Sequence, residues 1–576
     1  MAKQFGSMLI CLFAVVGCVD ATPSGPGFNL VSGGKSDYHI VLPANASPLE
    51  AKAADVFQRY IRQISGATLP IDKEGNGSSI HLVFIGRTRQ AVSRFRFDGL
   101  AKDAYVISTK DGNLYLGGNG DKGALYAVYA FLEKYIGCRK YDSGPAMVPT
   151  RQTIPVKGDF VDKVTPSFEY REAFFPESAD TEYLDWHHLN RIYTLWVHPF
   201  ANQIVSALKY FNAHPEYFAL VDGKRYGKQL DLSNDTVLQM ATEEVKQMIN
   251  DHPDQAYWAL SPNDDIHSCQ CPRCTAKNKA EGYIQGSVMP FVNSIANQFP
   301  DHQFITYAYQ YAARPPHTLM PAPNLTIFLS SIDATRESPL SESASAANFR
   351  TNLTGWMAKT QKLFVWDYSA QFTNYLKPFP DLMNMQPNLD WLHDKGVAGV
   401  FIQGTGVTEG DCSVLKSYMA AELLWNTSLS TDDLITDFCQ GYYGKAGTYI
   451  KTYLYNIDKN RRSTGASLNI YGDSTSNFNT YLAPNLVAQY DALLQQAEAA
   501  VQDDPVLLKR VKAFRLPVDY VILEQARMGM GSRVGNERIS RFAEDCRASG
   551  VKTLKEGNYT PDQYMGKVNG ALQRRN

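Results

Sequence analysis

The stretch from Tyr257 to Cys274 constrains the fold of this chain more than any other; it reads Tyr-Trp-Ala-Leu-Ser-Pro-Asn-Asp-Asp-Ile-His-Ser-Cys-Gln-Cys-Pro-Arg-Cys. It begins with an apolar run, Tyr257 to Leu260, of the length expected for a buried strand. Ser261-Pro262 ends that strand, because proline has no backbone N–H to donate to a sheet. Asp264 and Asp265 follow on the turn. Carboxylates at the C-terminal end of a buried strand are typical of the active face of a (β/α)₈ barrel, although Asp here also favours a helix N-cap.

Strand-like runs alternate with helical segments on both sides of this stretch. The alternation predicts an α/β fold, with a parallel (β/α)₈ TIM-type barrel over residues 165–430. The candidate strands are Glu169–Phe174, Arg191–Val197, Phe218–Val221, Tyr257–Leu260, Phe304–Tyr309, Leu325–Ser330, Leu363–Trp366 and Gly399–Gln403. These eight candidate strands lie within about 260 residues, which is the usual size of such a barrel.

Polar and aromatic residues stand at the C-terminal ends of most of these strands, where a barrel gathers its functional groups. Aromatic residues make up 12% of the chain, which suits stacking on flat sugar rings, although tyrosines on alternate strand positions also fill barrel interiors. The predicted catalytic residues are Asp264, Asp265 and Asp367. The predicted substrate contacts are His198, Asn263, Tyr307, Tyr309, Trp366 and Gln403.

The regions on either side of the barrel have different patterns. Residues 37–155 predict an α+β domain, with strand-like runs at 38–42, 81–85, 104–108 and 113–117 and helical patterns at 53–64 and 123–132. Residues 431–576 predict a C-terminal helical region. Its apolar stripes at 486–497 and 507–527 are expected to pack in a core.

Two sets of motifs resemble known families. Asp55 to Gly66, Leu116-Gly117-Gly118 and Gly123 to Glu133 resemble the N-terminal domain of α-glucuronidases and β-hexosaminidases, which carries no catalytic group. Phe211 to Arg225, the Ser261–Cys274 stretch and Gly441 to Ala446 resemble the bacterial domain of unknown function 4838 family, over about residues 165–450. This resemblance implies an α-glucuronidase-like barrel in exported proteins that handle complex glycans.

Glycoside cleavage needs one carboxylic acid at the leaving oxygen, and a second carboxylate or the substrate's acetamido group at the anomeric carbon. Asp264 with Asp265 matches the adjacent acids of β-hexosaminidases, whereas Asp264 with Asp367 matches glucuronidases, which draw their acids from different strands. Both families commonly place a Glu on the corresponding strand, and none lies between Tyr257 and Cys274. We therefore expect an exo-acting glycoside hydrolase for uronic acid or N-acetylhexosamine residues. The alternatives are a non-catalytic glycan-binding barrel, and a lyase or esterase for uronic-acid polymers.

Three cysteines crowd into the end of the same stretch. Cys269, Cys271 and Cys274 could hold a structural Zn²⁺, with His267 or a distant cysteine as fourth ligand. Because export would permit disulfides, one disulfide plus a free thiol is the alternative. Any zinc is expected to brace the loop that carries the acids, and catalysis itself is expected to require no cofactor.

The N-terminus has the pattern of an export signal. Lys3 precedes an apolar run from Met8 to Val16, which is too short to span a membrane as a mature helix. Val15 to Cys18 resembles a bacterial lipobox, which implies a signal over residues 1–18, lipidation of Cys18 and a linker over 19–36; a plain cleaved signal peptide is the alternative. We expect a periplasmic, outer-membrane or cell-surface lipoprotein. The net charge of −2 argues against nucleic acid, and membrane contact is expected only through the lipid anchor.

Overall fold

The computed structural model describes residues 26–75, 81–192, 197–531 and 533–573, and the chain divides into two compact units. The first unit comprises residues 1–138 and 148–165, and the second comprises residues 139–147 and 166–576. The predicted signal peptide and Cys18 lie outside the described residues. Among the residues that are described, we find no helix with the length and apolar character needed to span a membrane.

The first unit is built on a six-stranded mixed sheet with the strand order β3-β2-β4-β6-β5-β8. The long helix α1 begins at a capping box, in which Ser47 and Glu50 satisfy each other's backbone N–H groups, and it ends at Gly66, whose φ is 82°. Strand β1 lies within the predicted 19–36 linker and pairs with β7, so part of that segment is folded. The elements are β1 (Phe28–Val31), β2 (His39–Leu42), α1 (Pro48–Ser65), β3 (Ile71–Lys73), β4 (Leu82–Ile85), α2 (Arg89–Phe95), β5 (Tyr105–Lys110), β6 (Asn113–Gly118), α3 (Gly123–Phe131), β7 (Ile154–Val156) and β8 (Phe160–Val164).

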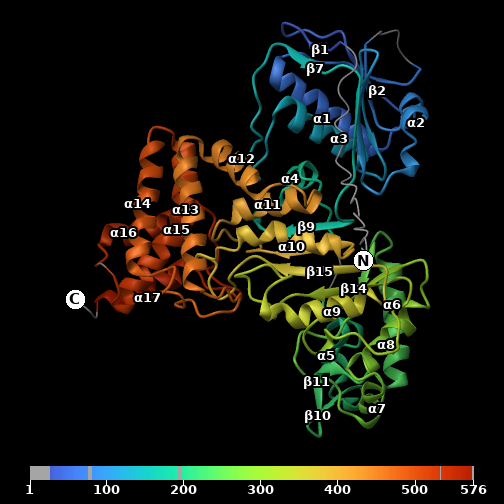
Figure 1. Cartoon of the computed structure of the whole chain (residues 1–576). Coiled ribbons are helices and arrows are strands. Elements are labelled where there is room, and N and C mark those ends of the chain that lie inside the picture. Colours follow the sequence, from blue (N-terminus) through green and yellow to red (C-terminus); the bar gives the residue numbers. More distant parts are fainter. Residues whose placement is uncertain (1–25, 76–80, 193–196, 532, 574–576) are drawn as a thin grey trace, which may run out of the picture. The chain divides into compact units, whose positions relative to one another are not determined.

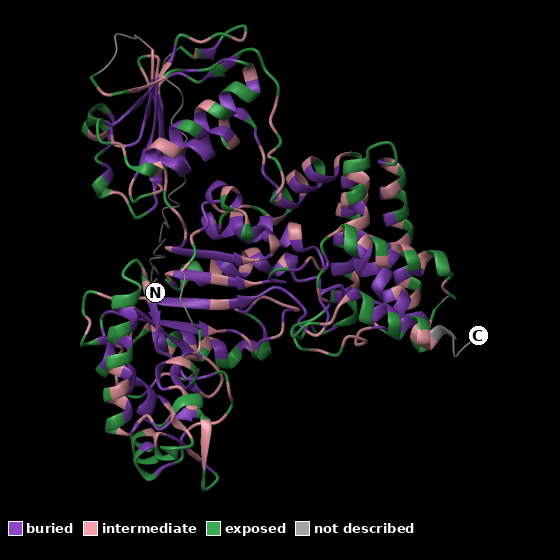
Figure 2. Cartoon of the chain, turned by 180° about the vertical axis from the view of Figure 1, so that it is seen from behind, coloured by how far each residue is buried: buried purple, intermediate pink, exposed green. Residues whose placement is uncertain are grey.

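The second unit is built on a six-stranded sheet that is parallel throughout, with the strand order β12-β13-β14-β15-β16-β9. Its strands are largely buried, as expected for a parallel sheet that helices cover on its outer side (Figure 2). The strands are β9 (Tyr170–Phe174), β12 (Tyr257–Ala259), β13 (Gln303–Ala308), β14 (Leu325–Ser330), β15 (Leu363–Tyr368) and β16 (Gly399–Gln403). All six coincide with predicted strands, and the sheet curls into a half-barrel.

The predicted eight-stranded barrel is not confirmed. The predicted strand at Phe218–Val221 is β10, which forms an antiparallel hairpin with β11 (Lys224–Leu230) instead of joining the parallel sheet. The cause is local: Asp222 and Gly223 both have positive φ, at 48° and 78°, and an Asp-Gly pair of this kind makes a two-residue hairpin turn. The predicted strand at Arg191–Val197 includes residues 193–196, which lie outside the described residues.

Helices cover the sheet and continue into the C-terminal region, which belongs to the same compact unit (Figure 1). The helices associated with the sheet are α4 (Thr181–Trp186), α5 (Ala207–Tyr210), α6 (Asp235–Asp251), α7 (Pro272–Ala280), α8 (Gln285–Ala296), α9 (Ala347–Met357), α10 (Leu382–Asp394) and α11 (Ser413–Trp425). The predicted C-terminal helical region forms α12 (Thr431–Tyr443), α13 (Gly447–Thr464), α14 (Pro484–Ala500), α15 (Pro505–Met528), α16 (Asn536–Ala548) and α17 (Pro561–Gln573). Aromatic and aliphatic side chains of the sheet, its helices and the C-terminal helices share one continuous core.

Candidate functional site

A cavity of about 200 Å³ lies at the C-terminal ends of the parallel strands. Aromatic side chains make up much of its wall, and polar groups are interspersed among them, as is usual for small-molecule sites. The residues that line it are Val197, His198, Asp264, Tyr307, Tyr309, Phe328, Ser330, Ile332, Trp366, Tyr368, Gln403, Tyr471 and Glu556. Five of the six predicted substrate contacts are among them: His198, Tyr307, Tyr309, Trp366 and Gln403.

An open groove adjoins the cavity and shares His198 and Asp264 with it. Asn202, Gln203, Lys228 and Asn263 also line this groove. Asp264 and His198 therefore stand where the cavity meets the groove. A ligand with one ring in the cavity would extend its remainder along the groove, and the bond between the two parts would lie beside these side chains.

Asp264 is an exposed carboxylate at this junction. Its Oδ1 accepts a hydrogen bond of 3.1 Å from the Tyr309 hydroxyl, which in turn accepts one of 2.7 Å from Nε2 of Gln310. Gln310 has a φ of 47°, an uncommon backbone conformation for a residue other than glycine. The relay fixes the orientation of the Asp264 carboxylate and leaves its other oxygen available to a ligand.

A second carboxylate in the cavity, Glu556, was not predicted from the sequence. It lies between α16 and α17, and its Oε2 accepts a hydrogen bond of 3.1 Å from the hydroxyl of Tyr471, another unpredicted lining residue. The backbone N–H of Glu556 donates to the carbonyl oxygen of Phe372 at 3.0 Å, which anchors this loop to the segment after β15. The only local signal in the sequence is a turn at Gly557, which says nothing about where Glu556 is delivered.

Asp265 does not line the cavity. Its Oδ2 accepts a hydrogen bond of 2.7 Å from Tyr226 on β11, and its Oδ1 accepts from the backbone N–H of His267 at 2.9 Å and lies 2.6 Å from that residue's Nδ1. Burial alone would raise the pKa of Asp265, but the hydrogen bonds from Tyr226 and His267 outweigh it and hold the pKa below its ordinary value. Asp265 is thus an ionised anchor for the loop, and the predicted adjacent acid pair does not form in the cavity.

Asp367 also lies away from the cavity. It is buried, its Oδ1 accepts a hydrogen bond of 2.6 Å from Ser331, and the same oxygen lies 3.0 Å from Nη2 of Arg336. The reason is the two-residue period of a strand: Trp366 and Tyr368 on β15 face the cavity, so Asp367 between them faces the opposite side. The structure does not bring Asp367 to Asp264, contrary to the pairing expected for a glucuronidase-like site.

His198 and Asn263 hold the rim of the site. Nδ1 of His198 donates to the carbonyl oxygen of Pro262 at 2.9 Å, and burial lowers the pKa of His198, so the ring is neutral near pH 7 with Nε2 as an acceptor. Oδ1 of Asn263 accepts from the backbone N–H of Ala201 at 2.7 Å. Its backbone oxygen accepts from Gln229 on β11 at 2.8 Å, so Asn263 ties the loop after β12 to its neighbours.

A further buried acid, Glu172 on β9, lies inside the half-barrel beneath the site and was not predicted. Its Oε2 accepts a hydrogen bond of 2.8 Å from Tyr170, and its Oε1 lies 3.2 Å from Nε of Arg191. Burial raises the pKa of Glu172 to about 7, in spite of the opposing effects of Tyr170 and Arg191. It does not line the cavity, so we regard it as part of the interior of the sheet.

The predicted metal ligands come together at a distance from the cavity lining. Cys269, Cys271 and Cys274 are buried free thiols, and the carboxylate of Asp231 joins them. His267, the predicted fourth ligand, contacts Asp265 instead and is not part of the group. Asp231 directly follows β11, some forty residues before the cysteines, and no spacing rule points to it.

Comparison with known proteins places the fold. The chain is similar to a family GH115 4-O-methyl-α-glucuronidase with specificity for decorated arabinogalactans, with a TM-score of 0.51 and 14% identity over 91% of this chain and 76% of that chain. Weaker similarities are to a GH84 protein (TM-score 0.43, 13% identity, 95% and 98% coverage) and to a GH138 enzyme targeting pectin rhamnogalacturonan II (TM-score 0.44, 10% identity, 93% and 98% coverage). The first similarity supports a shared fold.

No curated protein shows significant sequence similarity to the chain. The model of one protein family, described as a domain of unknown function (DUF4838), matches residues 140–455, which is more than half of the chain. This match covers the half-barrel, the loop of Asp264 and the cysteine cluster, and it confirms the resemblance seen in the sequence motifs. The chain belongs to the DUF4838 family.

Proposed function

We propose that this protein is an exo-acting glycoside hydrolase, in which Asp264 and Glu556 are the two catalytic carboxylates. The observation that carries the proposal is the presence of both carboxylates in one aromatic-walled cavity at the C-terminal ends of parallel strands. Glycoside hydrolysis requires two such groups about a sugar ring. The fold shared with a 4-O-methyl-α-glucuronidase supports the same class of reaction.

Each carboxylate has a positioning tyrosine. Tyr309 donates to Asp264 and Tyr471 donates to Glu556, so each acid keeps one oxygen fixed and presents the other to the substrate. One of the pair protonates the glycosidic oxygen, and the other either attacks the anomeric carbon or activates water toward it. Because Asp264 stands at the junction of cavity and groove, we assign it to the leaving-group side, as the general acid.

The cavity wall favours an uncharged sugar. None of the described residues that line it is Lys or Arg, and His198, its one imidazole, is neutral near pH 7 because burial lowers its pKa. A uronate carboxylate buried there would lack a partner of opposite charge, which is costly. Between the two sugars expected from the sequence, we therefore propose a terminal N-acetylhexosamine, whose ring would pack against Trp366 and Tyr307. Lys228 in the groove is placed for an acidic residue of the remaining glycan.

The test is turnover of a panel of aryl glycosides and natural glycans, with sugar release measured by chromatography. Asp264→Asn and Glu556→Gln should each lower kcat by about 10²- to 10⁴-fold while ligand binding persists. If Asp264 is the general acid, Asp264→Asn should slow the hydrolysis of activated aryl glycosides, which have good leaving groups, much less than the hydrolysis of natural glycans.

Two other outcomes would replace the proposal. Binding without turnover across the panel, unchanged in Asp264→Asn, would identify a glycan-binding half-barrel. Unsaturated or de-esterified products would identify a lyase or esterase.

We also propose that the protein is exported and anchored by a lipid on Cys18. The support is the apolar run before Gly17-Cys18 in the sequence. Wild-type protein should partition with membranes after cell fractionation, and Cys18→Ser should release it. Recovery of the wild type wholly in the soluble fraction would contradict this proposal.

A further inference from the structure

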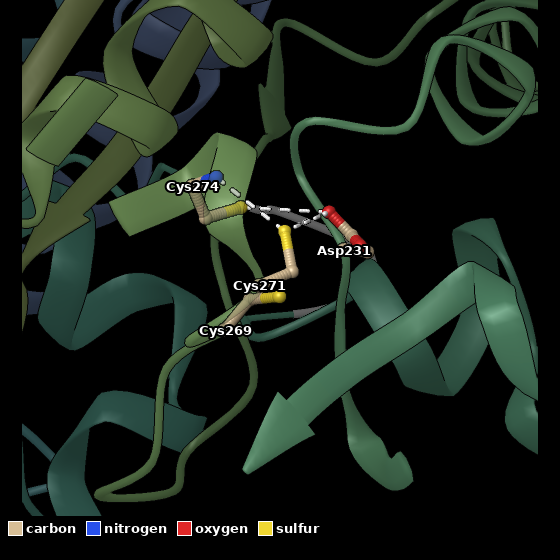
Figure 3. A group of neighbouring side chains, drawn as sticks. All are labelled: Asp231, Cys269, Cys271 and Cys274. Carbon is tan, nitrogen blue, oxygen red and sulfur yellow. Dashed lines mark hydrogen bonds between the residues drawn. The ribbon is translucent and has the colours of Figure 1, made fainter. Parts of the chain in front are cut away.

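Four side chains that could bind a metal converge beside the β10–β11 hairpin. One ligand atom from each of Asp231, Cys269, Cys271 and Cys274 lies within 4.8 Å of all the others, and all four residues are buried (Figure 3). The hairpin and α7 gather at one end of the second unit, away from the C-terminal helices (Figure 1). The described part of this region has only a small apolar cluster of its own, which includes Ala219, Val221 and the three cysteines.

The local chain geometry explains how the ligands meet. Asp231 directly follows the last residue of β11, and the cysteines lie on the loop that enters α7. Cys271 is the N-cap of α7 and Pro272 occupies its first turn, so Cys271 and Cys274, three residues apart, face the same side. Cys269 sits against β10, where its Sγ accepts a hydrogen bond of 3.4 Å from the backbone N–H of Leu220.

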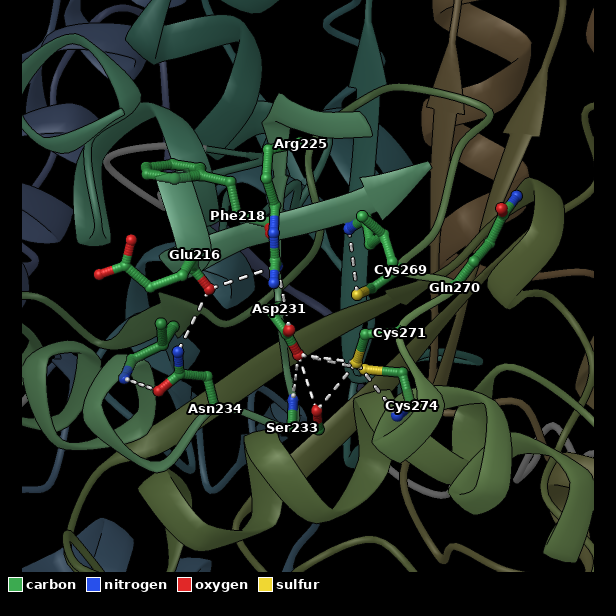
Figure 4. Close-up of polar contacts among 12 residues, drawn as sticks. Glu216, Phe218, Arg225, Asp231, Ser233, Asn234, Cys269, Gln270, Cys271 and Cys274 are labelled. Carbon is green, nitrogen blue, oxygen red and sulfur yellow. Dashed lines mark hydrogen bonds and ion pairs between the residues drawn. The ribbon is translucent and has the colours of Figure 1, made fainter. Parts of the chain in front are cut away.

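Hydrogen-bond donors and an arginine surround the cluster, where they would stabilise negatively charged ligand atoms. The backbone N–H of Cys274 donates to Sγ of Cys271 at 3.4 Å, and Arg225 lies 3.3 Å from Oδ2 of Asp231 (Figure 4). Ser233 donates to Oδ1 of Asp231 from its hydroxyl at 2.7 Å and from its backbone N–H at 3.1 Å. Contacts of this kind orient the ligands of a metal site and offset their charge.

We propose that Asp231, Cys269, Cys271 and Cys274 bind one Zn²⁺ ion as a closed, tetrahedral structural site. Zinc prefers thiolate ligands at about 2.3 Å and carboxylate oxygen at about 2.0–2.2 Å, which places tetrahedral ligands about 3.6–3.8 Å apart. Oδ1 of Asp231 is already 3.4 Å from Sγ of both Cys271 and Cys274, so only small movements are needed. Binding releases the three thiol protons to solvent, and the four protein ligands leave no position open for a substrate.

The site would brace the loop that presents Asp264. Tyr226 on β11 donates to Asp265, and Gln229 on the same strand donates to the backbone oxygen of Asn263. Asp231 follows Tyr226 and Gln229 by a few residues, and the cysteines follow Asn263 and Asp265 in the same way, so the zinc ligands lie next to these two contacts along both segments. The ion would therefore add a third link between the hairpin and the loop while remaining outside the cavity lining.

The proposal is tested by metal content and does not depend on enzymatic activity. Full-length protein purified without chelator should contain about one zinc per chain by plasma mass spectrometry. Cys271→Ser, Cys274→Ser and Asp231→Ala should each reduce this to a small fraction. The matched control is Cys439→Ser, a buried free cysteine of α12 outside the cluster, which should keep the full content.

Replacement of the metal gives a second readout on the wild-type chain, which is needed because the cluster variants could fail to fold. Apoprotein titrated with Co²⁺ should develop the thiolate-to-cobalt charge-transfer band and the intense visible bands of tetrahedral cobalt, saturating at one equivalent. Removal of zinc by a chelator should lower Tm, and added Zn²⁺ should restore it. Folded wild-type protein that neither contains nor takes up a stoichiometric metal would overturn the proposal, as would a disulfide mapped between two of the three cysteines.

Discussion

The placement of Asp367 makes a sharp prediction, because sequence and structure give this residue different roles. Asp367 is buried with Arg336, whose side chain is only 2% exposed, and Ser331 bridges the two through hydrogen bonds of 2.6 Å to Asp367 and 2.8 Å from Arg336. The substitution Asp367→Asn keeps a hydrogen-bond acceptor for Ser331 but leaves the guanidinium of Arg336 buried without an opposite charge. Removing one partner of a buried ion pair lowers the free energy of unfolding by about 3–5 kcal/mol.

We therefore expect Asp367→Asn to lower the free energy of unfolding by about 3 kcal/mol, near the lower limit because the hydrogen bond to Ser331 survives. The measurement is urea unfolding followed by circular dichroism, with the m-value used to check that the compactness of the denatured state is unchanged. The matched variant is Asp264→Asn. Asp264 is exposed, so this change should alter stability by no more than about 0.5 kcal/mol.

The effects of the two substitutions on activity should be the reverse of their effects on stability. Below its unfolding transition, Asp367→Asn should keep most of the wild-type kcat, whereas Asp264→Asn should lose it. Replacing both members of the pair, as in Asp367→Leu with Arg336→Met, should recover part of the lost stability. If Asp367→Asn were as stable as the wild type and yet inactive, Asp367 would act in the chemistry and our reading of its orientation would be refuted.

Three further predictions concern single side chains. Tyr309→Phe removes the 3.1 Å hydrogen bond that orients the Asp264 carboxyl group and should lower kcat/KM about 10- to 100-fold; an unaltered kcat/KM would contradict the relay. Burial, together with the nearby carboxylate of Glu409, raises the pKa of Glu177 to about 8. The folded state therefore keeps a proton that the unfolded state loses, and the free energy of unfolding decreases as pH rises from about 4.5 to 8. Glu177→Gln should remove this loss and be more stable than the wild type at pH 8 by a few kcal/mol but not at pH 4; parallel stability–pH curves in urea unfolding would argue otherwise. Asn263→Ala leaves a buried backbone N–H without its acceptor and should cost about 1–3 kcal/mol of unfolding free energy, whereas a loss below 0.5 kcal/mol would show that the loop re-forms without it.

The sequence determined the elements whose signals are local. Five of the six parallel strands are short, mainly apolar runs, and all six were predicted at their observed places, including β9, which carries Arg171 and Glu172. Because such strands deliver the residues at their C-terminal ends to one edge of the sheet, the positions of Asp264, Tyr309 and Trp366 in one cavity could also be expected. The hairpin at Asp222-Gly223 carried an equally local turn signal, which the expectation of an eight-stranded barrel overrode.

Tertiary structure decided the features that depend on contacts distant in sequence. Glu556 and Tyr471 reach the cavity from the C-terminal helical region, through loops whose course is set by packing and not by any periodicity. Asp231 joins the cysteines only because the hairpin folds back onto α7. Asp367 could have been assigned to either face from sequence alone: a shift of one residue in strand register reverses the orientation of every side chain, and the burial of Arg336 selected the face away from the cavity.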